Sequence, residues 1–514
     1  MKNVFLVILS FIFALLPAQA KNIQGVWHND LKTLFSKNSA IIYAINIRTF
    51  SAKDKNNNEI IDAGEECGNF LSAIDELDNL VKAGINTLHV LPITPVGKIK
   101  AFGTAGSLYA PVNLNEINPQ LVSSKSSLSG MEQAEKFIKE CHKRNLRVIL
   151  DLPGCGSYDM YVEHPEYFAL DEKQNTIIPF DWTDVRLFDC GTADKPNEDL
   201  LELHKKFIDM AIALNADGIR ADTAWIKPAY FWRELISYAH KKAPDLLFFA
   251  EASGLWIEPV SQNIPRTALY ELLTSGFDGC LGNYFDFKNW KTSKDLISTV
   301  KADLKLFSEF KTGKSAVGSF STHDEISPVL IHGAKFSKMI IWLNTTLPLN
   351  SYYIDGFSTG DTYNYSWANK CAQNSQTDDD YYFVHNGKMD IFNFSRKPQG
   401  DDYSIYEEFV LANKFKNYYA SDLCNAKFVP LKCSNPKVFA YARVTNNSSI
   451  IVFGNLDFNN PLNVTIKIPK FKPDKKIVNL RVHQDIANDY SKNKIKTTLD
   501  AGSIQVLLIR NFTF

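Results

Sequence analysis

The sequence lacks an excess of charge of either sign, because 56 basic residues stand against 57 acidic ones and the net charge is -1. Without a strong overall field the chain is not drawn to nucleic acid, and we expect its function to come from a local site. Glycine and proline are also sparse, at 25 and 21 of 514 residues, which excludes collagen-like and low-complexity chains. A globular protein with a barrel-sized unit and accessory pieces fits this length.

Long apolar runs are missing as well, since no segment approaches the roughly 20 residues that span a bilayer. One apolar run, residues 4–16, follows Lys2 and precedes Ala-Gln-Ala at residues 18–20. A basic start, an apolar run and a small-x-small sequence in this order are typical of a secretory signal peptide. We therefore predict a signal peptide over residues 1–20, a secreted or periplasmic protein without a membrane span, and a monomer.

No two of the eight cysteines form a C-x-x-C pair, so a zinc or thioredoxin-like site is not indicated. Disulfides persist outside the cytoplasm, and Cys424 and Cys433 lie near enough in the sequence to close a short loop. Other pairings do not follow from the sequence, and some of the cysteines can instead be buried free thiols.

Strand-like and helix-like segments alternate over residues 40–420. A β-rich run, AIIYAINIRTF, begins at Ala40, and residues 69–83 then place apolar side chains at helical spacing. Further strand-like segments are INTLHVLPI, LRVILDLP, DGIRAD, LLFFAEAS, FDGCLGN, AVGSFSTHD and LPLNSYYIDGF. About eight strands in such an alternation predict an α/β fold, a (β/α)8 TIM barrel over residues 21–424. The alternative, a doubly wound open sheet, lacks the Gly-rich phosphate turn after its first strand.

Two regions depart from this alternation. Residues 152–200 are rich in aromatic, acidic and proline residues, and we interpret them as a short subdomain inserted after the third strand. Residues 425–514 read as short strands separated by Asn and Pro turns, which predicts a C-terminal all-β sandwich domain.

Polar side chains end several of the predicted barrel strands: Asp151, Arg220, Asp222, Glu251, His323 and Asp324. In a barrel of this kind the carboxyl ends of the strands carry the active site. Each residue alone is equally well explained as a helix N-cap. Together they predict one site with three or more acidic groups, an arginine and a histidine.

The segments DGIRADTAW, FFAEAS and FSTHDE occur in this order at predicted strand ends and resemble three motifs of the α-amylase superfamily, glycoside hydrolase family 13. The resemblance extends through YAINIRTF, GINTLHVLPITPVGK, RVILDLP, HPEYF and DWTDV to the C-terminal sandwich. It implies a retaining enzyme acting on α-glucans, with Asp222 as nucleophile, Glu251 as general acid/base and Asp324 as the carboxylate that binds the sugar ring. Such an enzyme needs a neutral acid and an ionised carboxylate side by side.

Arg220 lies two residues before Asp222, so both side chains point to the same face of the strand. We expect its positive charge to keep Asp222 ionised and to leave Glu251 as the more easily protonated group. The resemblance also implies that His323 donates a hydrogen bond to the sugar and that Tyr109 stacks on it, although an ordinary buried aromatic explains Tyr109 equally well. Trp225 is a candidate platform for a sugar face.

The sequence departs from the family at two places. Cys155 and Gly156 stand where the family usually has Asn-His, which implies that a calcium site and a sugar contact are absent there. Trp225-Ile226-Lys227 stands where many α-amylases carry Lys-His. This difference favours action on α-glucosidic bonds in general over endo-hydrolysis of starch.

The loop DKNNNEIIDAGE has the spacing of an EF-hand-type calcium loop. The oxygen ligands at its positions 1, 3, 5, 7, 9 and 12 are Asp54, Asn56, Asn58, the carbonyl of Ile60, Asp62 and Glu65. Glu59 occupies position 6, where a sharp turn prefers glycine, so a solvated loop without metal is an equal alternative. Calcium there would stabilise the loop, and the chemistry itself requires no cofactor.

The sequence thus predicts an exported retaining glycosidase whose partner is an oligo- or polysaccharide α-glucan. Glycosyl transfer is the nearest alternative, because it differs only in whether water or a sugar hydroxyl resolves the covalent intermediate. The third possible function is that of a catalytically impaired barrel that binds carbohydrate, although impaired barrels of this kind usually lose a carboxylate that this chain keeps.

Overall fold

The protein is described by a computed structural model, which covers residues 27–53, 55, 64–101, 106–180, 182–256, 266–311, 313–361, 403–472, 477–481 and 489–514. The predicted signal peptide, residues 1–20, lies outside these residues, as does the predicted calcium loop except for Lys55, Gly64 and Glu65. Every helix in the described part is too short or too polar to cross a membrane.

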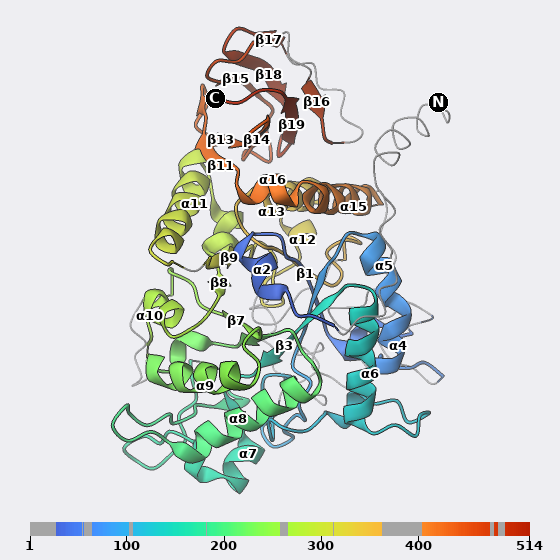
Figure 1. The fold of residues 1–514 in the computed structure, drawn as a ribbon, viewed down its shortest axis with the longest axis vertical. Coiled ribbons are helices and arrows are strands. Elements are labelled where there is room, and N and C mark those ends of the chain that lie inside the picture. Colours follow the sequence, from blue (N-terminus) through green and yellow to red (C-terminus); the bar gives the residue numbers. More distant parts are fainter. Residues whose placement is uncertain are drawn as a thin grey trace.

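Within the described residues, eight parallel strands form one sheet (Figure 1). Their order is β10 (Ser351–Ile354), β1 (Ile41–Ile45), β2 (Thr87–Val90), β3 (Arg147–Leu152), β6 (Gly218–Ala221), β7 (Leu247–Ala250), β8 (Gly279–Leu281) and β9 (Ser315–Val317). A parallel bridge between Val317 and Asn350 joins the two outermost strands and closes the barrel. The predicted (β/α)8 barrel is confirmed, and the register pairs Asp151 on β3 with Arg220 on β6.

The strands β1, β2, β3, β6 and β7 are buried along their whole length, as expected for parallel strands covered on both faces. Figure 1 shows helices around the sheet. They include α2 (Leu31–Ser36), α6 (Gly130–Lys143), α8 (Glu198–Ala213), α9 (Ala229–Lys242), α10 (Leu269–Thr274), α11 (Ser293–Ser308), α12 (Pro328–His332) and α13 (Ala334–Thr346). The first turn of α6 is fixed by a capping box between Ser129 and Glu132.

The structure corrects the sequence prediction at two elements. The β-rich run that begins at Ala40 ends after β1, because the Asn46 side chain accepts a hydrogen bond from the Arg48 N–H at 3.1 Å and starts the helix α3 (Ile47–Phe50). The helix expected over residues 69–83 is divided into α4 (Phe70–Ala73), the 3-10 turn η1 (Ile74–Glu76) and α5 (Leu77–Lys82).

The insertion after β3 contains β4 (Gly156–Ser157), α7 (Tyr158–Glu163), η3 (Pro165–Tyr167) and β5 (Val185–Arg186) before the chain enters α8. β4 and β5 form an antiparallel pair. Val185 of β5 and the neighbouring Leu187 form a small core with Ala110, Cys155 and Ile226. The predicted subdomain after the third strand is therefore confirmed.

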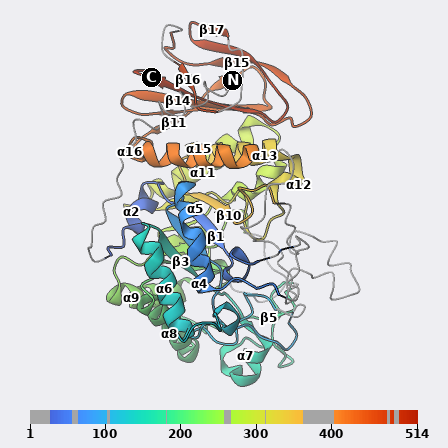
Figure 2. The same ribbon diagram turned by 90° about the vertical axis from the view of Figure 1, so that its right-hand side faces the viewer.

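The C-terminal region consists of two antiparallel sheets. One has the order β11 (Lys427–Pro430), β13 (Val438–Val444), β14 (Ser448–Asn455), β19 (Ile504–Arg510) and β16 (Ile477–Asn479), and the other β12 (Lys432–Cys433), β15 (Leu462–Lys467), β18 (Lys494–Leu499) and β17 (Asp489–Ser491). Apolar side chains of both sheets share one core, which confirms the sandwich. Figure 2 shows it at one end of the molecule, above α13, α15 (Tyr403–Tyr418) and α16 (Ala420–Cys424).

Six cysteines of the described part are free thiols: Cys141, Cys155, Cys190, Cys280, Cys424 and Cys433. The short loop that these two residues were candidates to close therefore has no disulfide in this structure.

Candidate active site

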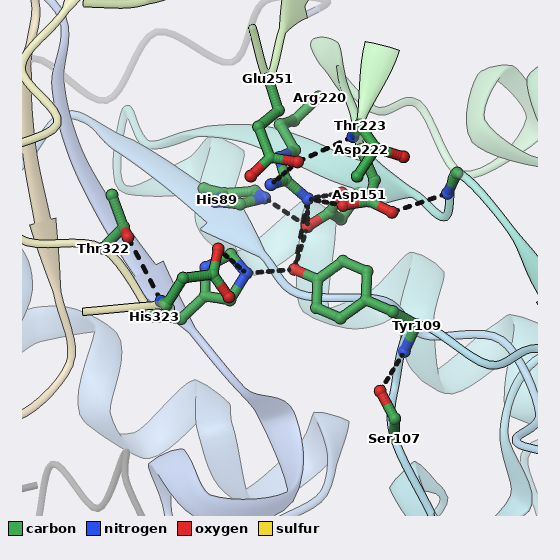
Figure 3. Close-up of polar contacts among 12 residues, drawn as sticks. His89, Ser107, Tyr109, Asp151, Arg220, Asp222, Thr223, Glu251, Thr322 and His323 are labelled. Carbon is green, nitrogen blue, oxygen red and sulfur yellow. Dashed lines mark hydrogen bonds and ion pairs between the residues drawn. The ribbon is translucent and has the colours of Figure 1, made fainter. Parts of the chain in front are cut away.

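The polar residues predicted at strand ends come together on one side of the barrel (Figure 3). Asp151 and Arg220 lie on β3 and β6, and Asp222 and Glu251 follow β6 and β7 directly. His323 and Asp324 lie in the loop after β9. Since parallel strands end at the same edge, four different segments place their side chains within reach of each other.

Arg220 is the centre of this cluster. Its Nη1 donates to Asp151 Oδ1 at 2.9 Å and to Asp222 Oδ1 at 3.1 Å, and its Nη2 lies 2.9 Å from Glu251 Oε2. The sequence predicted a pairing with Asp222, but the guanidinium contacts Glu251 equally. Contact with Arg220 alone therefore does not decide which of these two carboxyl groups carries a proton.

The protonation of the carboxyl groups follows from their burial. Burial raises the pKa of Glu251 well above its usual range, and the nearby Asp222 and Asp324 raise it further against the opposing effect of Arg220. Burial also raises the pKa of Asp222, but Arg220 and the Gly154 N–H, which donates to Asp222 Oδ2 at 2.8 Å, favour its ionised form. Glu251 is therefore the better proton holder and Asp222 the better anion.

Two further carboxyl groups complete this electrostatic arrangement. Burial alone would raise the pKa of Asp151, but Arg220 and His89 outweigh it and lower the pKa to about 2. Burial raises the pKa of Asp324 to about 7, although 37% of its side chain remains exposed, so water screens this charge more than the others. At neutral pH Asp151 is an anion, and protons are available to the other carboxyl groups.

The backbone next to Asp222 is unusual. Thr223 has φ 42° and ψ 41°, a left-handed conformation that β-branched residues rarely adopt, and its N–H donates to Glu251 Oε2 at 2.7 Å. A Cβ on Gly154 would lie 1.9 Å from Thr223 Oγ1 and 2.7 Å from the Asp222 carbonyl oxygen. Glycine at position 154 is therefore required for this close approach of two loops.

The Tyr109 hydroxyl lies between Asp151 and His323. The Tyr109 hydroxyl donates to Asp151 Oδ2 at 2.7 Å and lies 2.8 Å from His323 Nε2. The two rings are stacked with centroids 5.3 Å apart. His323 Nε2, which the resemblance assigns to a sugar hydroxyl, thus already has a protein partner in this structure.

A cavity of about 470 Å³ opens over these residues, a size typical of small-ligand sites. Its walls include Tyr109, Asp222, Trp225, Glu251, His323 and Asp324, that is, six of the seven residues predicted for catalysis and substrate binding. Arg220 lies beneath the cavity, 2% exposed. The ring centroid of Trp225 lies 5.5 Å from that of Phe180 and 6.1 Å from that of Trp256. The Arg266 guanidinium lies 5.0 Å from the same centroid.

Other residues of the site carry little local signal in the sequence. Phe180 and Arg266 line the cavity, but both lie in irregular segments whose positions depend on tertiary folding. His89 lies in the middle of an apolar strand, where a single polar residue is the only signal. Gly154 was visible as part of DLPGCGS, but its role depends on the approach of Thr223.

The two departures from the family pattern lie beside the cavity. Cys155 is buried at its wall, and burial raises the pKa of its thiol to about 12. The Lys227 ammonium donates to the Gly154 carbonyl oxygen. Among the described residues no cluster of three or more His, Cys, Asp or Glu side chains is arranged to hold a metal.

The calcium loop stays a prediction. Of its ligands only Glu65 belongs to the described residues, and its Oε1 accepts a hydrogen bond from the Lys55 N–H at 2.7 Å. The other five ligands, Asp54, Asn56, Asn58, Ile60 and Asp62, lie outside the part that the structure describes.

No protein-family model matches the chain, but individual proteins do. The α-1,4-glucan:maltose-1-phosphate maltosyltransferase of Corynebacterium glutamicum is 24% identical over 52% of this chain and 39% of its own length. The enzyme of the same name from Picrophilus torridus is 22% identical over 86% of this chain and 68% of its own length. Alpha-amylase 3 of Dictyoglomus thermophilum is 22% identical over 82% of this chain and 87% of its own length. The chain thus spans less than half the length of the first of these relatives.

Solved structures share the fold over most of the chain. An α-amylase from Lactobacillus plantarum has a TM-score of 0.67 at 17% identity and covers 92% of this chain and 99% of its own. The α-amylase of Geobacillus thermoleovorans in complex with acarbose has a TM-score of 0.65 at 15% identity, and the match covers 93% of this chain and 100% of that one. The chain thus shares its barrel, its insertion after β3 and its C-terminal sandwich with α-amylases of solved structure, and over half of its length or more it is similar in sequence to two maltosyltransferases and an α-amylase.

Proposed function

We propose that this chain is an exported retaining glycoside hydrolase that cleaves α-glucosidic bonds in α-glucans or maltooligosaccharides by double displacement. One observation carries the proposal: a single guanidinium, that of Arg220, contacts both Asp222 and Glu251, and both carboxyl groups line one cavity. The shared guanidinium and a side-chain hydrogen bond between the two residues bring their carboxyl groups close together, as a retaining pair with its separation of about 5 Å requires.

In the first step the ionised Asp222 attacks the anomeric carbon. The proton of Glu251 passes to the glycosidic oxygen, the bond to the leaving sugar breaks, and a glycosyl ester forms on Asp222. In the second step Glu251, now ionised, removes a proton from water, and the hydroxide oxygen displaces Asp222 from the anomeric carbon. Two inversions give a product with the same anomeric configuration as the substrate.

The other residues of the cavity hold the sugar. Asp324 keeps a partly exposed carboxyl group facing the cavity, which suits hydrogen bonds to ring hydroxyls. Tyr109 and Trp225 also line the cavity, and aromatic rings of this kind pack against sugar rings. The Arg266 guanidinium over Trp225 fixes that ring.

Glycosyl transfer is the second candidate function. Trp225, Trp256 and Phe180 form an aromatic wall close to Glu251, and such a wall favours a sugar acceptor over water. Two of the relatives named above are maltosyltransferases. A binding protein without activity is disfavoured, because Asp222, Glu251 and Asp324 are all present and face one cavity.

Product analysis tests the proposal. Protein beginning at Lys21 is incubated with starch, glycogen, pullulan and maltooligosaccharides, and the products and their anomeric form are resolved by NMR as they appear. Shorter α-anomeric products support hydrolysis with retention, and products longer than the substrate shift the function to transfer. Products with inverted configuration, or no turnover of any glucan, would overturn the proposal. Export is tested separately, by whether the full chain is cleaved after residue 20 when it is expressed with its own N-terminus.

A further inference from the structure

His89 lies inside the barrel and uses both of its ring nitrogens. It belongs to β2 and is 0% exposed. Its Nε2 lies 3.1 Å from Asp151 Oδ2, and its Nδ1 lies 2.9 Å from the Tyr352 hydroxyl on β10. Figure 3 shows His89 behind Arg220 and Asp151, on the side away from Tyr109.

The partners of His89 determine which nitrogen carries its hydrogen. The ionised carboxylate of Asp151 only accepts hydrogen bonds, so Nε2 must be the donor. Burial lowers the pKa of His89 although Asp151 opposes this effect, and the ring is therefore neutral. A neutral ring has one bare nitrogen, so Nδ1 accepts the hydrogen of the Tyr352 hydroxyl. His89 thus supplies a directed hydrogen bond and no charge.

Asp151 connects His89 to Arg220, which contacts the reacting groups. Its Oδ2 accepts from His89, Tyr109 and Arg220, and its Oδ1 also accepts from Arg220. Of the described residues, those that line the cavity do not include Asp151, which is 1% exposed. Asp151 therefore acts by holding Arg220, and Arg220 reaches Asp222 and Glu251.

We propose that His89 is a positioning residue for the sugar-cleaving reaction: its Nε2–H anchors Asp151, and Asp151 holds Arg220 where one guanidinium reaches both Asp222 and Glu251. The inference rests on the proposed function, because it assigns His89 to the same pair of carboxyl groups. Without the Nε2 donor Asp151 keeps its charge but loses one of the bonds that fix its orientation. The guanidinium then shifts relative to both reacting groups, while the walls that bind the sugar stay in place.

Kinetics of matched variants test this role. His89→Leu fills a similar volume without a donor, and we expect kcat to fall about 100-fold, the usual cost of a small misplacement of reacting groups. KM should change less than about 3-fold, because the lost interaction acts only in the transition state. His89→Gln offers an amide N–H to Asp151 and should recover kcat to within about 10-fold of the wild type.

His204→Leu is the control for loss of a buried histidine. His204 on α8 is also 0% exposed; its Nδ1 faces the Leu200 carbonyl at 2.9 Å, and its ring packs against Phe188 and Phe231 rather than against Asp151 or Arg220. This variant should keep kcat within about 2-fold whatever its thermal stability. A His89→Leu protein that folds and keeps wild-type kcat, or equal losses in the Leu and Gln variants at position 89, would overturn the proposal.

A second measurement does not depend on turnover. Isotope-edited NMR of the histidine rings in the wild-type protein at neutral pH should show His89 as the neutral tautomer with hydrogen on Nε2. An imidazolium, or hydrogen on Nδ1, contradicts the role assigned to His89 even if the enzyme is fully active. If no α-glucan is turned over, the proposed function fails, and the tautomer still decides whether His89 anchors Asp151.

Discussion

Arg220 in the barrel and Arg481 in the C-terminal region are both buried and both pair with carboxylates, but Arg220 contacts more carboxylates than Arg481 does. Among the described residues Arg481 pairs with one carboxylate, that of Glu408 of α15, with an Nη2–Oε1 distance of 2.7 Å, and it also donates to the Ile504 carbonyl. Trp342 Nε1 donates to the same Glu408 carboxylate. Arg220 has three carboxylate partners, Asp151, Asp222 and Glu251.

The difference explains why one pair is structural and the other region reactive. Around Arg481 one positive charge meets one negative charge, and their polar atoms are largely satisfied, so the pair joins α15 to the sandwich. Around Arg220 a single cation cannot neutralise three carboxylates, so protons must be retained at neutral pH. Burial raises the pKa of Glu251 well above its usual range, and the neighbouring carboxyl groups raise it further, so that Glu251 can act as an acid.

The strongest test of this comparison replaces one glutamate in each region. Glu251→Gln removes the proton donor, and we expect turnover to fall by about 1,000-fold or more, with maltooligosaccharide binding by calorimetry retained. Glu408→Gln should leave turnover per folded molecule unchanged but lower the free energy of unfolding by about 3–5 kcal/mol, because it leaves Arg481 buried and unpaired. Wild-type turnover in Glu251→Gln would end the catalytic assignment.

Replacing the two arginines sharpens the contrast. Arg220→Met leaves Asp151 and its neighbours without their cation, and we expect kcat to fall by about 100- to 1,000-fold. Arg481→Met should keep kcat and lose stability by about 3–5 kcal/mol. Initial rates at saturating substrate and urea unfolding measure the two effects, and similar kcat values in both variants would contradict the distinction.

A smaller effect is expected from the glycine that lets Asp222 and Thr223 approach. Gly154→Ala places a methyl group 1.9 Å from Thr223 Oγ1, so one of the two loops must move, and we expect kcat to fall about 10-fold or more. Gly254→Ala is the matched control, because its Cβ would meet only Asn283 Nδ2 at 3.7 Å. Equal rates in the two variants would show that the approach of the loops is not needed.

The smallest effect concerns a carboxyl group that has no cation bonded to it. Asp184 in the insertion is 2% exposed, and neither oxygen has a hydrogen bond of good geometry among the described residues. Burial raises its pKa to about 7 against its own N–H, Ser107 and Arg186. A raised folded pKa contributes stability that is fully present below about pH 4, the unfolded value, and is lost as the pH rises through about 7.

Asp184→Asn removes this titration. The free energy of unfolding of the wild type should therefore fall relative to that of the variant between about pH 4 and pH 8, by roughly 1–3 kcal/mol. Urea unfolding at several pH values measures the difference. Parallel curves for the two proteins would show that Asp184 is not held neutral in the fold.

Much of the barrel and the centre of the site could be predicted because the information is local. Apolar runs mark the buried strands, and Asp222 and Glu251 follow two of them directly. The helix α3 was missed because the cap at Asn46 overrides the β-branched run that precedes it. His89, Arg266 and the Arg481–Glu408 pair depend on contacts between distant segments, 73 residues apart in the last case, and no local pattern records such contacts.

The most direct test of the account is to identify the residue that forms the covalent intermediate. A fluoride leaving group needs no acid, so Glu251→Gln protein treated with an α-glucosyl or α-maltosyl fluoride should form the ester and hydrolyse it slowly, since the base is also missing. Mass spectrometry of the proteolysed protein should then find the added sugar on Asp222. A sugar on any other residue, or none while the fluoride is consumed, would contradict the assignment of Asp222 and Glu251 as a retaining pair.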